Sequence, residues 1–188
     1  MKNKNTFNKL RLYEDYLYNY KLDSLTKFNY INNLDHCRFS KISLNFGFRN
    51  INFDKKRMML FFMVLELISN QKSYITFSKK NLFSLKIKKG SITGCKVTLR
   101  KENLYNFLDT LIISLPRNDT FQGFSLKKKN KKVKSVWLKI NQLFIFHNIE
   151  SELVDYVKNL DINFVTNSIC YEEKLFLLTY NKIPILFK

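Results

Sequence analysis

The sequence predicts an α+β fold, a two-layer sandwich with helices packed on one face of a mainly antiparallel sheet. Of its 188 residues, 45% are hydrophobic, which is enough to bury one substantial core. Segments in which apolar and polar residues alternate are mixed with segments whose apolar residues recur every three or four positions. Strand-like and helix-like segments do not alternate strictly along the chain, whereas an α/β fold requires such alternation. We therefore expect one domain over residues 1–188, with a flexible tail at 1–7.

The first half of the chain predicts two helices and three strands. Residues 8–27 have near-helical apolar spacing, and residues 42–47 alternate as a half-buried strand does. Residues 55–69 are apolar on nearly every side, which predicts a helix deep in the core. Residues 73–88 alternate weakly and predict two strands joined by a basic loop over 78–84.

The second half opens with a strand over residues 94–100 whose two faces differ. Cys95, Val97 and Leu99 form an apolar face, and the intervening positions form a polar, basic face. The later elements are predicted as a helix over 102–115, a Lys-rich loop within 125–136, a strand over 137–146, a helix over 149–160, a strand over 162–166 and a last helix over 171–180.

The chain is strongly basic, with 33 Lys and Arg against 15 Asp and Glu and a net charge of +18. Lys supplies 27 of the bases, and there are 22 Asn but no Ala, which indicates an AT-rich gene and some charge acquired by drift. Drift does not explain why charges of one sign are clustered along the chain. Residues 67–101 hold nine bases and no acid, and residues 117–149 hold eight bases and one acid. Residues 150–173 are acidic. This pattern predicts two kinds of partner.

Three widely spaced cysteines predict a reducing compartment rather than a disulfide framework. The longest apolar run, residues 58–65, is far below the roughly 18 residues that span a bilayer, so no membrane partner is expected. The first 40 residues contain Glu14, Asp15 and Asp23 and do not resemble an import signal. If the protein works in an organelle, we therefore expect it to be synthesised inside that organelle.

No motif predicts catalysis, a cofactor or a metal. Residues 90–96 have three residues between their glycines, where a phosphate-binding loop needs four, and lack its Ser or Thr after the lysine. His36 and His147 have no neighbours at metal-ligand spacing, and a structural or surface role is expected for both. A small RNA-processing enzyme remains the remote alternative, although neither an acidic metal site nor a histidine-based catalyst is visible.

The strongest functional signal is the stretch from Gln71 to Arg100, which is basic, interleaved with aromatic residues and free of acids. Lys, Thr, Asn and Gln on an exposed sheet face can contact phosphates, sugars and 2′-hydroxyl groups. A solvated strand face in a Lys-rich protein is the other interpretation. The complete exclusion of acids favours RNA binding.

The ordered motifs resemble those of the large-subunit ribosomal protein L five family, which binds 5S rRNA. The most specific is GCKVTLRKENLYNFLDTLIISLPR at 94–117. KISLNFGF at 41–48, LELISNQKSYIT at 65–76, IKKGSITG at 87–94, FQGF at 121–124 and LDINFVTN at 160–167 also match. The resemblance covers nearly the whole chain.

The resemblance implies a scaffold without catalytic activity in the central protuberance of the large subunit, beside other large-subunit proteins. The residues that it implies for contact with 5S rRNA are Asn45, Gln71, Thr98 and Arg100. Lys96, on the same strand face, and Lys72, next to Gln71, are expected to join them. It also implies that Thr76, Lys79 and Lys80 lie in a loop facing the P-site tRNA. Glu150, Glu152 and Asp155 would face a basic small-subunit head protein across an intersubunit bridge, or would form a solvated helix face.

One departure from the family concerns residues 125–136, where SLKKKNKKVKSV replaces a Gly-rich hairpin. This change is compatible with an organellar ribosome whose 5S rRNA is altered or absent. We therefore expect an organelle-encoded, mitochondrial protein. The alternative within the same family is a scaffold that contacts only large-subunit rRNA and proteins.

Overall fold

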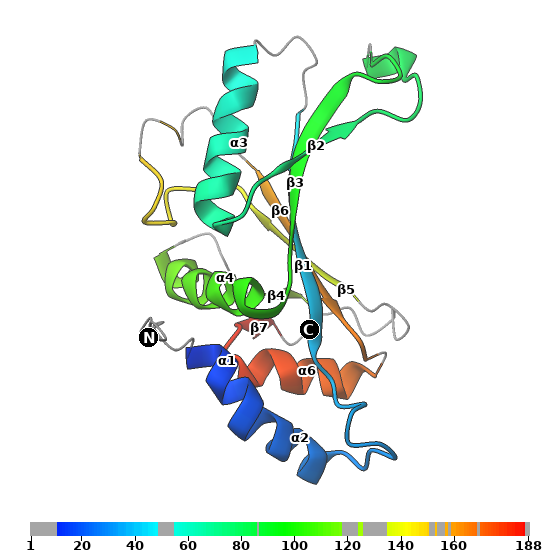
Figure 1. Cartoon of the computed structure of the whole chain (residues 1–188), viewed down its shortest axis with the longest axis vertical. Coiled ribbons are helices and arrows are strands. Elements are labelled where there is room, and N and C mark those ends of the chain that lie inside the picture. Colours follow the sequence, from blue (N-terminus) through cyan, green and yellow to red (C-terminus); the bar gives the residue numbers. More distant parts are fainter. Residues whose placement is uncertain are drawn as a thin grey trace, which may run out of the picture.

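The computed structural model describes residues 11–48, 55–85, 87–117, 124–125, 135–150, 153, 157, 159–168 and 170–186. Its centre is a five-stranded antiparallel sheet with the strand order β2-β3-β1-β6-β5 (Figure 1). The strands are β1 Phe39–Gly47, β2 Tyr74–Phe77, β3 Ile92–Leu99, β5 Ser135–Ile140 and β6 Leu160–Thr166. A second, two-stranded parallel sheet joins β4 (Phe124–Ser125) to β7 (Ile185–Leu186).

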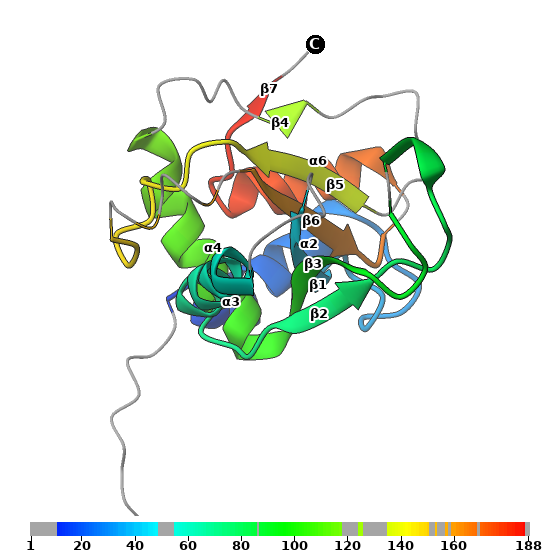
Figure 2. The ribbon, with the colours of Figure 1, turned by 90° about the horizontal axis from the view of Figure 1, so that it is seen from above.

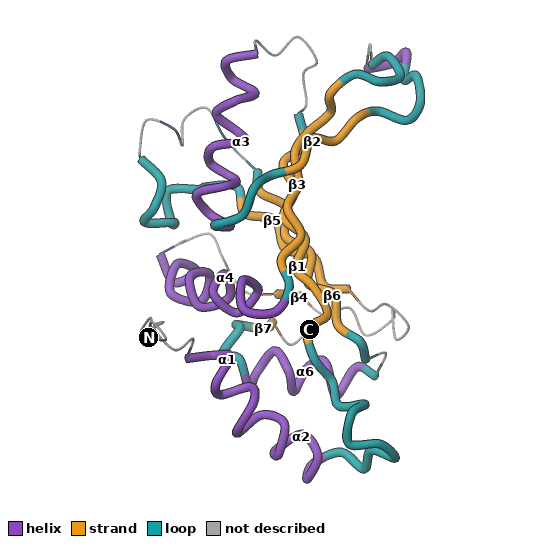
Figure 3. The backbone as a smooth tube through the Cα atoms, in the orientation of Figure 1, coloured by secondary structure: helices purple, strands orange, loops and turns teal. Residues whose placement is uncertain are grey.

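The helices lie along one side of the sheet and at one end of it (Figures 1 and 3). They are α1 Arg11–Asp15, the π-helix η1 Tyr16–Tyr20, α2 Lys21–Lys27, α3 Lys55–Ser69, α4 Lys101–Ser114 and α6 Tyr171–Tyr180, with short 3₁₀ turns at η2 Phe83–Leu85 and η3 Leu115–Arg117. The predicted α+β class is confirmed. The view in Figure 2 shows α3 and α4 together on the same side of β1 and β3.

The core forms between the apolar face of the sheet and these helices. Ile42 and Leu44 of β1, Leu99 of β3 and Phe164 of β6 are all 0% exposed. Alternation sends every second residue of each strand into this layer, and the intervening residues to the other face. Leu111 of α4 is equally buried, as a residue on the inner stripe of an amphipathic helix should be.

The helix predicted over 8–27 is confirmed over its described part, as one continuous helical segment from Arg11 to Lys27. Its middle turn, η1, is a π-helix, a wide turn that often occurs at functional sites. Tyr20 in this turn is 1% exposed and packs its ring against Phe176 and Tyr180 of α6, at 5.7 and 5.1 Å between centroids. These contacts fasten the N-terminal segment to α6.

Helix α3 has the predicted bounds, but the prediction that it lies deep in the core is wrong. Val64 and Leu65 are fully buried, whereas Met59, Met63 and Leu67 are 63%, 54% and 41% exposed. The exposed residues recur every four positions and therefore form a stripe along the outer face. Uniform hydrophobicity does not reveal which side of a helix meets the sheet.

Two strand predictions need correction. The second strand predicted after the loop 78–84 is not formed by the described residues, since the turn η2 extends to Leu85 and only a single bridge joins Leu82 to Ile87. The strand predicted over 137–146 ends at Ile140 and is followed by turns. In both places the chain leaves the sheet, although Leu143, Ile145 and Phe146 after β5 still join the hydrophobic core. Most of the predicted helix over 149–160 and of the Lys-rich loop lies outside the described residues.

Candidate nucleic-acid interface

The face of the sheet that α3 and α4 leave uncovered, called the open face below, presents polar and aromatic side chains. The strand registers align one residue from each strand in a single row across it. This row runs Tyr74, Lys96, Asn45, Asp161, Lys139. Side chains directly opposite each other on neighbouring strands lie close enough to contact one ligand together.

A second row lies beside the first and joins four strands. It runs Thr98, Ser43, Asn163, Trp137. Trp137 is 68% exposed and offers a flat aromatic surface at the β5 edge. Trp137 is therefore the position in this row at which a base can stack. The side-chain Oδ1 of Asn163 is buried and has no hydrogen-bond partner among the described residues.

The predicted positions Lys96 and Thr98 do face outward, while Cys95 and Val97 between and beside them are buried. The ammonium group of Lys96 lies 5.8 Å from the centre of the Tyr74 ring. This cation–π contact orients the lysine without neutralising it. Asp161 lies opposite Lys139 in the register of β5 and β6. Sequence reasoning did not assign this acid to the open face.

The remaining predicted RNA contacts border the open face. Gln71 follows α3, and its Nε2 donates to the carbonyl oxygen of Thr98 at 3.4 Å, which holds it beside β3. Lys72 is exposed next to it. Arg100 lies just beyond the end of β3, exposed, and forms the N-cap of α4. The structure thus brings all six of these residues to one side of the sheet or its rim.

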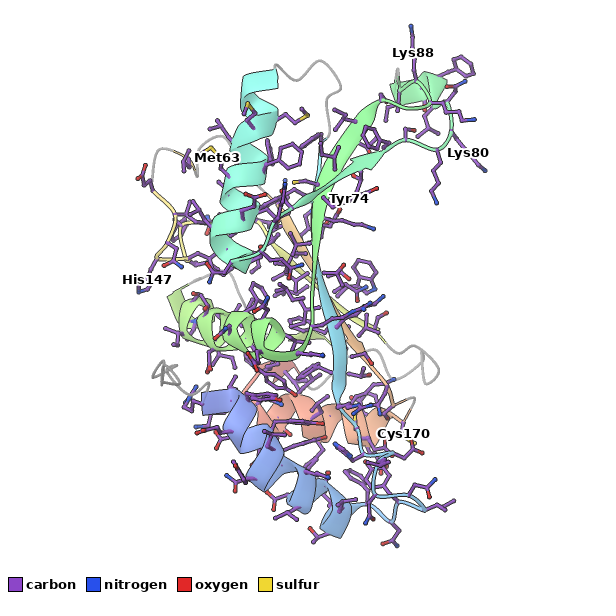
Figure 4. The ribbon with its side chains drawn as sticks, in the orientation of Figure 1. Met63, Tyr74, Lys80, Lys88, His147 and Cys170 are labelled. Atoms are coloured by element: carbon purple, nitrogen blue, oxygen red, sulfur yellow. The ribbon has the colours of Figure 1, made fainter. Side chains whose placement is uncertain are left out.

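Strands β2 and β3 diverge from α3 towards their tip, where they carry the loop 78–91 (Figure 4). Thr76 lies inside β2, whereas Lys79 and Lys80 are exposed at the tip. The tip also holds Phe83, which is 89% exposed and which sequence reasoning did not single out. The proposed tRNA-facing residues are therefore split between a strand and a basic, aromatic tip.

Glu150 is exposed at the end of the turns that follow β5. Figure 4 places His147, three residues earlier, on the side of α3 and α4, whereas Lys80 lies at the tip. Glu152 and Asp155 lie outside the described residues. His147 and the basic tip consequently occupy different parts of the molecule.

The described residues contain no group of three or more His, Cys, Asp or Glu side chains that could hold a metal ion. His36 is 4% exposed, and its Nε2 lies 2.8 Å from the hydroxyl group of Tyr16. Burial lowers the pKa of this imidazole, which favours its neutral form. No helix within the described ranges has the length and apolar character to cross a membrane.

Sequence reasoning missed that Trp137, Lys139 and Asn163 lie on the open face. Each is separated from Lys96 by more than 40 positions, so only the strand order joins them. A usable signal was present, because these residues occupy the polar positions of alternating strands. The order of the strands in the sheet was the missing information.

Comparisons with known proteins identify the family of the chain. Residues 92–185 match the model of the C-terminus of the ribosomal L5 family. The large ribosomal subunit protein uL5 of Wigglesworthia glossinidia brevipalpis is 36% identical over 176 residues, which is 93% of this chain and 98% of that protein. The uL5m protein of Reclinomonas americana is 36% identical over 88% of this chain and 92% of its own length. The uL5 protein of Wolbachia pipientis (strain wPip) is 35% identical over 84% of this chain and 89% of its own length. The chain therefore belongs to the uL5 family of large ribosomal subunit proteins, whose members are structural rather than catalytic.

Proposed function

We propose that this protein is a structural constituent of the large ribosomal subunit and binds 5S rRNA in the central protuberance through its open face. The supporting observation is the row of Tyr74, Lys96, Asn45, Asp161 and Lys139 across all five strands. Lysines contact phosphates and supply a salt-sensitive affinity. Asn45, Thr98 and Gln71 offer hydrogen-bonding groups suited to 2′-hydroxyl groups and groove edges.

The basic tip is proposed to approach the elbow of the P-site tRNA through Lys79 and Lys80. Both side chains are exposed. Close to them, β2 is held to β3 by the hydrogen bond that Thr93 Oγ1 donates to the carbonyl oxygen of Thr76 at 3.1 Å. Glu150, with Glu152 and Asp155, is proposed to face a basic protein of the small-subunit head. A crosslinker attached at position 80 or at position 150 of the protein in assembled ribosomes tests these two contacts separately. The first should react with the tRNA and the second with the small-subunit protein.

We infer a mitochondrial, organelle-encoded origin from the Lys- and Asn-rich composition and the absence of alanine. The mitochondrial uL5m relative supports this inference, but bacterial relatives are equally similar. An organelle without 5S rRNA would use the same scaffold against large-subunit rRNA and neighbouring proteins only. A census of the RNAs that co-sediment with the protein distinguishes the two cases, and cell fractionation tests the location.

Titration of the full chain with a bacterial 5S rRNA transcript tests the open face. The logarithm of the binding constant should fall linearly with the logarithm of salt concentration, by about 0.7 to 0.9 per phosphate contacted. Lys96→Ala should weaken binding and reduce the salt slope by about 1. Lys21→Ala, in α2, removes the same charge away from the open face and should leave both unchanged.

Equal behaviour of the two variants would contradict the assignment of the open face. Binding that is insensitive to salt would contradict the electrostatic argument as a whole. The alternative of a ribosome without 5S rRNA would be favoured by a different result. In that case the protein would bind large-subunit rRNA but not the 5S transcript, and Lys96→Ala would still weaken the binding.

A further inference from the structure

A pocket of about 420 Å³ opens where the N-terminal helical segment, the start of β1 and the start of α4 meet. Its lining includes Tyr13 and Tyr16 of the helical segment, Arg38 just before β1, and Arg100 and Lys101 at the junction of β3 and α4. This volume falls within the range of about 300 to 1,000 Å³ that is usual for sites binding small ligands. The pocket lies beyond the rows of the open face.

One wall of the pocket is made of three tyrosine rings, two of which contact the third. The ring of Tyr105 lies 5.4 Å from that of Tyr13 and 5.4 Å from that of Tyr16. Tyr105 is 5% exposed and is held in the core, and the hydroxyl group of Tyr16 is 2.8 Å from His36 Nε2. The wall is therefore preorganised, and a flat ring can lie against it without ordering a flexible side chain.

Three cationic side chains in the lining favour a ligand that carries a negative charge. Arg38, Arg100 and Lys101 line the pocket, and none has a carboxylate partner among the residues that the structure describes. Arg11, on the same helical segment, differs because it donates to Asp109 at 2.8 Å. Three cations around one pocket repel one another, and a bound phosphate relieves that repulsion.

The backbone of α4 adds donors to the same place. Lys101 and Leu104, which line the pocket, belong to the first turn of this 14-residue helix. The N–H groups of a first helical turn have no partner within the helix, and the Arg100 side chain makes no capping hydrogen bond to them. Lys101 has a φ of 53°, a left-handed conformation that a non-glycine residue adopts at a cost. Such helix ends favour phosphate groups.

We propose that this pocket binds a single unpaired nucleotide, with its base against the tyrosine wall and its phosphate between Arg38, Arg100 and the N-terminus of α4. The proposal rests on the proposed function and extends it, because Arg100 follows Lys96 and Thr98 at alternate positions and so leads from the open face into the pocket. A nucleotide extruded from a bound RNA and a free mononucleotide share this chemistry. A paired nucleotide cannot turn its base face to the wall.

The test compares three probes on the full chain: an RNA hairpin with one bulged 2-aminopurine nucleotide, the same hairpin fully paired, and AMP. We expect the bulged hairpin to bind about ten-fold more tightly than the paired one, as stacking of one base on aromatic rings predicts, and its fluorescence to be quenched. Arg38→Gln and Tyr13→Leu should remove the preference and the quenching while binding of the paired hairpin stays near the wild-type value.

Arg11→Gln and Tyr18→Leu are the matched controls, since both side chains lie on the same helical segment and neither lines the pocket. They should retain the preference. Saturable AMP binding that Arg38→Gln abolishes would identify the free nucleotide as a ligand. Equal affinity for the two hairpins without AMP binding would overturn the pocket while the open face stands. Failure of every RNA to bind would overturn the RNA function itself.

Discussion

Trp137 is the single tryptophan of the chain, and its ring is 68% exposed on the open face. Its cross-strand partner is Asn163, whose Oδ1 is buried without a partner among the described residues. A large exposed aromatic ring suits a nucleotide base that stacks on it. We therefore assign Trp137 to the proposed RNA contact.

We expect Trp137→Leu to weaken binding of the 5S rRNA transcript by about 1–3 kcal/mol, the usual contribution of one stacked base. In the unchanged chain, saturating RNA should quench the tryptophan fluorescence. Phe144→Leu is a control, since Phe144 is 53% exposed in the turns after β5 and outside the rows. Unaltered fluorescence at full RNA occupancy would show that Trp137 does not stack on a base.

At the scale of elements, the joining of β1 to β3 depends on a glycine. A β-carbon at Gly94 would overlap the carbonyl oxygen of Phe46 on the neighbouring strand. Gly47, its partner in the register, has open space where a β-carbon would be. This contact positions Lys96 and Thr98 opposite Asn45 and Ser43. The close approach therefore sets the geometry of the open face.

We predict that Gly94→Ala lowers the free energy of unfolding by about 1–3 kcal/mol, because the strands must separate to admit the methyl group. Gly47→Ala should change it by less than about 0.5 kcal/mol. Urea unfolding followed by circular dichroism measures both. Equal stability of the two variants would contradict the close contact.

At the scale of the whole molecule, the core protects two of the three thiols. Cys37 and Cys95 are 1% and 0% exposed, and Cys170 is exposed. Burial raises the pKa of Cys37 to about 11 and that of Cys95 to about 12. Because these thiols ionise more readily in the unfolded chain, whose thiols have a pKa near 9, the folded state loses stability as pH rises above that value.

We predict that one thiol of the native protein reacts rapidly with Ellman's reagent and that two react only as fast as the protein unfolds. Cys170→Ser should abolish the rapid phase alone. The urea midpoint should be lower at pH 10 than at pH 7.5. Rapid reaction of all three thiols at pH 7.5 would show that the β1–β3 core is open in solution.

Much of the architecture follows from short-range patterns that the sequence carries by itself. The bounds of α3 and α6 and the outward direction of Lys96 and Thr98 were predicted, because periods of 3.6 and 2 assign a side chain to one face of its own element. The charge segregation was equally visible. What no period encodes is which elements become neighbours.

The tertiary structure alone decided which face of α3 meets the sheet, how Trp137 and Asn163 join Lys96 on the open face, and where the tyrosine pocket forms. Strand order and register bring together residues that lie far apart in the chain, through non-local contacts that local patterning does not specify. The sequence by itself determined the kind of surface and the family that carries it. Packing of five strands against the helices determined the shape that this surface offers to an RNA.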